Sequence, residues 1–104
     1  QKQSITVRIC SWNVGTLQPG EERVNQLRRW LTPEGEDGAD IIAVGLQEIV
    51  KLTGNALFVH ESSVESKVWE DRLSQVIAGR GDYSVVVSRQ YVGVYHFVAV
   101  RKEL

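Results

Sequence analysis

The fold of this chain is decided by the stretch Ile-Ile-Ala-Val-Gly-Leu-Gln-Glu at residues 41–48. Its six apolar residues predict a strand in the interior of a sheet, buried on both faces. Gln47 and Glu48 follow directly after this strand. A carboxylate at the end of a buried strand loses hydration, so it stays ionised only beside an arginine, a hydrogen-bonding group or a metal ion.

A second strand ends in the same way nearer the N-terminus. Residues 5–12 alternate apolar and polar side chains, which predicts a strand, and Asn13 follows it. A helix is expected between the two strands, over residues 21–31, with acidic residues in its first turn and arginines in its last. A right-handed strand–helix–strand crossover would bring Asn13 and Glu48 to the same edge of the sheet.

The rest of the chain predicts a second helix and two further strands. A capping box that begins at Ser62 opens a helix over residues 62–78. Strands are expected at residues 83–87 and 91–100, joined by residues 88–90. The order is therefore β-α-β-α-β-β, which indicates an α/β fold.

Composition narrows the class of protein. The chain has 104 residues, of which 42% are hydrophobic and 24% charged, so we expect a single globular domain. We expect no transmembrane segment and no leader, because no apolar run approaches the roughly 18 residues that a spanning helix needs. The lone Cys10 suits a reducing compartment, hence the cytoplasm, with peripheral attachment to membranes left open. A net charge of −1 argues against binding of nucleic acid by the surface as a whole.

One carboxylate and one amide at a single sheet edge suit a hard cation. Mg²⁺ is commonly held by one or two carboxylates, with water and substrate phosphate in the remaining positions. Two alternatives stay open from the residues alone. Glu48 could form an ion pair with Arg8 or Arg89, and Asn13 could be a simple turn residue.

The other polar residues suggest no complete catalytic site. Asn55 is by default a turn residue, and His96, among apolar neighbours, is expected to be a hydrogen-bonded core histidine. The sequence has no phosphate-binding glycine-rich loop and no nucleophile elbow. Activation of water on a phosphate needs a base and donors for the developing charge, and these cannot be assembled from the 104 residues.

Five segments, taken in order, resemble the opening of the inositol polyphosphate 5-phosphatase catalytic domain, and its synaptojanin and plant branches in particular. They are Ser-Trp-Asn-Val (11–14), Ala-Asp-Ile-Ile-Ala-Val-Gly-Leu-Gln-Glu-Ile-Val (39–50), Gly-Asn (54–55), Trp-Glu-Asp-Arg-Leu (69–73) and Ser-Arg-Gln-Tyr-Val-Gly-Val-Tyr-His-Phe-Val-Ala-Val-Arg (88–101). The resemblance implies the DNase I-like endonuclease/exonuclease/phosphatase fold. Residues 1–104 would then be the first half of a four-layer α/β sandwich, an incomplete N-terminal portion of one catalytic domain.

The resemblance also implies an activity: Mg²⁺-dependent hydrolysis of the 5-phosphate monoester of inositol phosphates or phosphoinositides. By position, Glu48 matches the family's Mg²⁺-ligating glutamate. Asn13 matches its first-strand asparagine at the metal and the scissile phosphate, and Asn55 matches a loop asparagine near the substrate. Gly15 departs from the pattern, because many members carry Asn there and related nucleases carry Asp.

The family's later motifs, which hold the water-activating and phosphate-binding groups, are absent from this sequence. The leading hypothesis is therefore part of a 5-phosphatase, completed by a second polypeptide or a missing C-terminal segment and inactive by itself. A truncated, non-catalytic interaction module is one alternative. A Mg²⁺-dependent nuclease of the same fold is another, which the near-neutral charge disfavours. Since residues 91–100 are apolar on both faces, another layer is expected to cover them.

Overall fold

Four strands and two α-helices make up the part of the chain that the computed structural model describes, residues 4–35, 38–50 and 64–103. In chain order they are β1 (Val7–Asn13), a 3₁₀ turn η1 (Glu21–Arg23), α1 (Val24–Leu31), β2 (Ile41–Gln47), α2 (Val64–Ala78), β3 (Tyr83–Tyr91) and β4 (Val94–Arg101). The predicted β-α-β-α-β-β order is confirmed. No helix within these ranges has the length and apolar character needed to cross a membrane.

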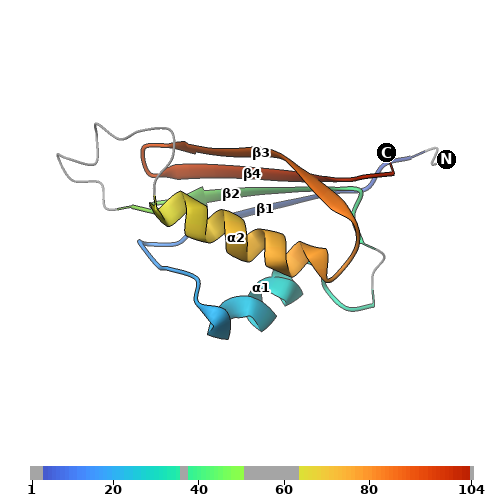
Figure 1. Ribbon diagram of the computed structural model, residues 1–104, viewed down its shortest axis with the longest axis horizontal. Coiled ribbons are helices and arrows are strands. Elements are labelled where there is room, and N and C mark those ends of the chain that lie inside the picture. The colour runs from blue at the N-terminus through green and yellow to red at the C-terminus, as the bar shows by residue number, and fades with distance from the viewer. Residues whose placement is uncertain (1–3, 36–37, 51–63, 104) are drawn as a thin grey trace.

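The strands form one sheet in the order β1-β2-β4-β3 (Figure 1). β1 and β2 are parallel neighbours, and their register runs from Val7 opposite Ile41 to Asn13 opposite Gln47. β4 is antiparallel to both β2 and β3. Because β1 and β2 end level with each other, the predicted meeting of their carboxyl ends at one edge is confirmed.

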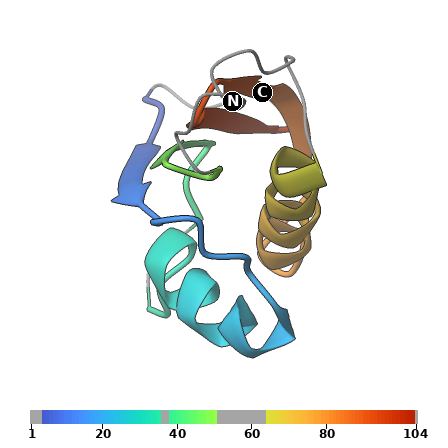
Figure 2. The same ribbon diagram turned by 90° about the vertical axis from the view of Figure 1, so that its left-hand side faces the viewer.

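Both helices lie on one side of the sheet, and the core lies between them and the strands (Figure 2). Alternate residues of β2 and β4 point into this core and are fully or almost fully buried: Ile42, Val44, Leu46, Tyr95, Phe97 and Ala99. Trp69 of α2 is also fully buried. Trp12 joins β1 to both helices, since its ring meets Trp30 and Trp69 in edge-on contacts with centroids 5.8 and 6.0 Å apart.

The opposite face of the sheet, here called the open face, is uncovered in the described part of the chain. Ile9 is 79% exposed there, and Val94 and Val98 of β4 share this face because they alternate with buried residues. The prediction that β2 is buried on both faces is therefore wrong for this structure. Its residues alternate between buried and partly exposed, because the helices of residues 4–35, 38–50 and 64–103 all cover the same face of the sheet.

The β3–β4 connection also differs from the prediction. β3 continues through residues 88–90, which were expected to be the loop, and the turn falls at Val92 and Gly93. Ser88 and Arg89 are exposed, because β3 is an edge strand with one side open to solvent, whereas Gln90 is buried. The actual break is Val92, whose φ of +54° cannot continue a strand.

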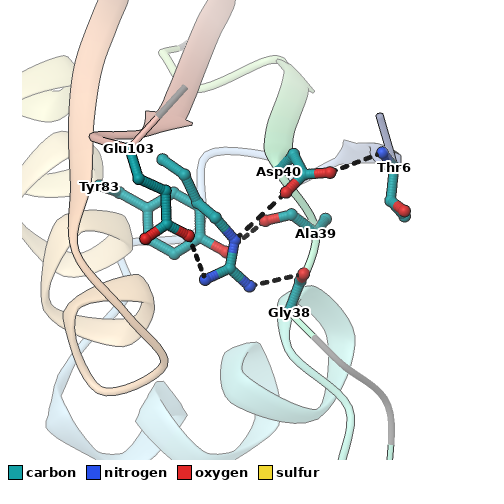
Figure 3. A network of polar contacts seen from close by, with 7 residues as sticks. Thr6, Gly38, Ala39, Asp40, Tyr83 and Glu103 are labelled. Atoms are coloured by element: carbon teal, nitrogen blue, oxygen red, sulfur yellow. Dashed lines mark hydrogen bonds and ion pairs between the residues drawn. The ribbon is translucent and has the colours of Figure 1, made fainter. Parts of the chain in front are cut away.

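A buried polar network fixes the end of the sheet opposite the carboxyl ends of β1 and β2 (Figure 3). The carboxylate of Asp40, 0% exposed, accepts the backbone N–H of Thr6 at 2.9 Å and lies 3.5 Å from Nε of Arg101. The guanidinium of Arg101 also donates to the carbonyl of Gly38 at 2.6 Å and lies over the ring of Tyr83. The network thus joins the start of β1, the entry to β2 and the end of β4.

Replacing Asp40 with Ala is expected to destabilise the fold by about 3 kcal/mol or more, because it removes the buried carboxylate beside Arg101. Among the described residues, only the exposed carboxylate of Glu103, 3.7 Å from Nη1, then remains beside this largely buried guanidinium. Urea unfolding of the purified chain measures the change. The matched control is Asp82→Ala, whose carboxylate is 84% exposed and lies 3.6 Å from Nζ of Lys102. That variant should stay within about 1 kcal/mol of the wild type. Equal losses for the two variants would contradict this account of the network.

Candidate active site

The candidate site is built where β1 and β2 end side by side. Asn13 is the last residue of β1, and Glu48 follows Gln47, the last residue of β2. The pairing continues past both strands, because Val14 N–H donates to the Gln47 carbonyl at 2.9 Å and Thr16 N–H donates to the Glu48 carbonyl at 2.7 Å. The two strand ends are therefore held in fixed relative positions.

The side chains of Asn13 and Glu48 are in direct contact. Nδ2 of Asn13 donates to Oε2 of Glu48 at 2.6 Å, while Oδ1 of Asn13 accepts the backbone N–H of Gly15 at 3.1 Å. The second bond fixes the orientation of the amide, so its NH₂ group faces the carboxylate. In the described part of the chain, the hydrogen-bond partner of the Glu48 carboxylate is thus the Asn13 amide. The alternative of an ion pair would have required an arginine in that place.

The donor set fits one hard cation. Oε1 of Glu48 has no protein partner among the described residues, and Glu48 is only partly buried. Residues 4–35, 38–50 and 64–103 contain no cluster of three or more His, Cys, Asp or Glu that could enclose a metal. A single carboxylate held by a neighbouring amide suits Mg²⁺, which keeps several waters and takes substrate oxygens as ligands. The metal-binding and catalytic roles of Asn13 and Glu48 remain predictions.

A left-handed turn after β1 sets the position of the Asn13 amide. Gly15 and Thr16 have φ of +55° and +65°, and a Cβ added at Gly15 would meet no atom within 4 Å. The positive φ therefore restricts which residue types can occupy position 15, whereas the space around it would admit a side chain. Asn and Asp adopt this conformation more readily than other side chains. The Gly in this chain is thus compatible with the same turn as the Asn and Asp expected from the resemblance.

Two further polar side chains lie on the open face next to the site, and the sequence did not single out their contact. Nε2 of Gln47 donates to Oγ of Ser11 at 3.1 Å across the β1–β2 pair. The signal was available in the sequence, because both side chains are polar and the parallel register separates them by only two positions. His96, expected in the core, is exposed, because in β4 it alternates with the buried Tyr95 and Phe97.

Cys10 and Asn55 lie outside the contacts described above. Cys10 is a free, buried thiol in β1, and burial raises its pKa, so it is a packing residue and a poor nucleophile. Asn55, predicted to be a substrate-binding residue, lies outside the described residues, and its role stays a prediction.

The fold and the site together define an α/β protein with a polar site at the carboxyl ends of two parallel strands. The family model for endonuclease/exonuclease/phosphatase family 2 matches residues 10–104. The chain therefore belongs to this family.

Within this family, the chain is similar to synaptojanins. The chain is 37% identical over 111 residues to synaptojanin-2 of Rattus norvegicus, a match that covers 93% of this chain and 7% of the relative. It is 29% identical over 114 residues to synaptojanin of Caenorhabditis elegans, covering 97% of this chain and 10% of the relative. The chain thus spans a tenth or less of the length of these two proteins.

A solved structure confirms the predicted fold. The inositol polyphosphate 5-phosphatase domain of SPsynaptojanin, in complex with inositol (1,4)-bisphosphate and calcium ion, matches with a TM-score of 0.76 and 26% identity. The match covers 95% of this chain and 28% of that one. The chain therefore has part of a DNase I-like fold and corresponds to the N-terminal part of an inositol polyphosphate 5-phosphatase domain.

Proposed function

We propose that this chain is the portion of a Mg²⁺-dependent inositol polyphosphate 5-phosphatase that supplies Glu48 and Asn13 to the metal site. The reaction would be hydrolysis of the 5-phosphate monoester of an inositol phosphate or a phosphoinositide. The observation that carries the proposal is the 2.6 Å contact between Asn13 and Glu48 at the level ends of β1 and β2. In open α/β sheets this edge is where ligands bind.

The ligands of the SPsynaptojanin domain support the substrate class. Inositol (1,4)-bisphosphate has no phosphate at position 5, so it is what remains when inositol 1,4,5-trisphosphate loses that group. The calcium ion in that complex is a hard cation that prefers oxygen ligands, as Mg²⁺ does. Both observations belong to the relative and come to this chain as part of the proposal.

The two residues would have different roles. Glu48 would ligate Mg²⁺ through the oxygen that Asn13 does not contact, and Asn13 would hold the carboxylate in a single orientation. Mg²⁺, when bound, would act as a Lewis acid toward a phosphoryl oxygen. Asn13 could also donate to a phosphate oxygen once its contact with Glu48 is relaxed. Water activation and leaving-group protonation require further groups, which the proposal places outside these 104 residues.

The proposal includes a covering layer for the open face. A second polypeptide or a missing C-terminal segment would complete the sandwich and bury exposed apolar residues such as Ile9 and Tyr91, each 79% exposed. The same layer would bring the remaining catalytic groups to the site. A cytoplasmic location, with a membrane surface as the source of phosphoinositide, is part of this proposal.

The 104-residue chain alone is expected to release no phosphate from inositol 1,4,5-trisphosphate or from phosphatidylinositol 4,5-bisphosphate vesicles in Mg²⁺. The reason is that a cation site without a base and phosphate donors leaves the attacking water unactivated. Turnover by the purified chain, free of any second polypeptide, would contradict this expectation.

A chimera tests whether the chain supports activity once the domain is complete. It joins this chain to the part of the SPsynaptojanin domain beyond the matched region. It should release phosphate from the same substrates, and the chimera with Glu48→Gln should not. The SPsynaptojanin domain itself is the reference. A chimera that unfolds cooperatively on heating but remains inactive, while the reference is active, would overturn the proposed function.

A further inference from the structure

The β3–β4 turn holds the backbone on one side of Glu48. The N–H of Ile49 donates to the carbonyl of Gly93 at 3.0 Å, and on the other side Thr16 N–H donates to the Glu48 carbonyl at 2.7 Å. Glu48 itself has a φ of +57°, which is uncommon for a residue with a side chain. Such a conformation persists only when its surroundings fix it. Gly93 is therefore part of what keeps Glu48 in place.

The turn that presents Gly93 needs support of its own. Val92 has a φ of +54°, which is an outlier for a β-branched residue. Nε2 of Gln90 donates to the Val92 carbonyl at 2.8 Å, across the turn. Gln90 is only 1% exposed, although it sits on an edge strand rich in exposed side chains.

The burial of Gln90 makes this contact specific. Its Oε1 is buried with no hydrogen-bond partner among the described residues, so the bond from Nε2 to Val92 is the one that holds the amide. A buried amide is unfavourable unless it is hydrogen-bonded. An apolar residue would be the simpler choice for packing alone, and the amide therefore points to a role in shaping the turn.

We propose that Gln90 is a positioning residue for Glu48. Its amide fixes the Val92 carbonyl, the turn then presents the Gly93 carbonyl to Ile49, and this bond holds Glu48 against Asn13. The proposal rests on the proposed function in one respect, namely that Glu48 is the cation ligand. Gln90 itself would contact neither cation nor substrate.

The test compares Gln90→Leu with the wild-type chain and with Gln26→Leu. The control removes an exposed amide in α1, which accepts a bond from Arg23 at 3.0 Å. Two measurements are made on each variant. Mn²⁺ is the metal probe, and the electron paramagnetic resonance signal of free Mn²⁺ gives the affinity of the chain for the ion. Hydrogen exchange of the Ile49 amide shows whether its hydrogen bond to the Gly93 carbonyl is kept. Gln90→Leu should lower Mn²⁺ affinity about tenfold, the size of effect that supporting residues of metal sites have, and should remove protection at Ile49.

Each result decides the proposal. Normal protection of Ile49 in Gln90→Leu, or lost protection with unchanged Mn²⁺ affinity, would overturn it. A merely structural role would lower thermal stability without the selective loss of affinity. If the wild-type chain binds no Mn²⁺, Ile49 protection alone decides whether Gln90 positions this backbone, and the chimera decides the proposed function. If Gln90→Leu does not fold, Gln90→Asn, whose shorter amide cannot reach Val92, replaces it in the same measurements.

Discussion

Replacing Glu48 with Gln is expected to reduce Mn²⁺ affinity by at least about 100-fold, more than the loss of an outer-shell partner does. The substitution keeps the size of the side chain and removes its charge, and Glu48 is the carboxylate in contact with Asn13. Titration of free Mn²⁺ by electron paramagnetic resonance measures the change.

The matched control for this variant is Glu22→Gln, which removes an exposed carboxylate from η1. Its Mn²⁺ affinity should equal that of the wild type. If the two variants lose affinity equally, binding is a property of net charge and Glu48 has no special role.

The second large effect concerns the open face. The isolated chain is expected to self-associate in solution, because exposed apolar side chains of several strands share this face. Ile9→Lys places a charge on the open face of β1. The association constant should fall about tenfold or more, because one large apolar side chain is then no longer buried on association. Light scattering over a dilution series measures the association.

Val64→Lys is the control for this effect. Val64 is 78% exposed in the first turn of α2, which lies on the side of the sheet opposite the open face. This variant should associate as the wild type does. A wild-type chain that is a cooperatively folded monomer at all concentrations would contradict the interpretation of the open face, as would equal effects of the two lysines.

The parts of the fold that could be predicted were those determined by local pattern and chain topology. The apolar run 41–46, the alternating residues 5–12 and the helix between them indicate a strand–helix–strand crossover. The meeting of Asn13 and Glu48 followed from the parallel pairing of the two strands in that unit. The two helices were also predictable, the first from its apolar spacing and the arginines in its last turn, and the second from the apolar spacing of the residues that it buries.

The features that could not be predicted depend on contacts distant in sequence. The β3–β4 turn was misplaced because residues 88–90 are polar, and nothing local shows that Gln90 is buried and bonded to Val92. The apolar neighbours of His96 favour a core position, and they do not show that His96 lies on the strand face opposite the buried Tyr95 and Phe97. The orientation of the Asn13 amide depends on the left-handed turn at Gly15, which sequence alone indicates only weakly.

The most direct test of the account is the location of Mn²⁺ on the ¹⁵N-labelled chain. Paramagnetic broadening in nuclear magnetic resonance spectra identifies the amides nearest the ion. The Asn13 side-chain amide and the backbone amides of Glu48 and Ile49 are expected to broaden first, and Glu48→Gln should remove the effect. Broadening centred on other carboxylates, such as those of Asp82 and Glu103, with these signals unchanged, would contradict it.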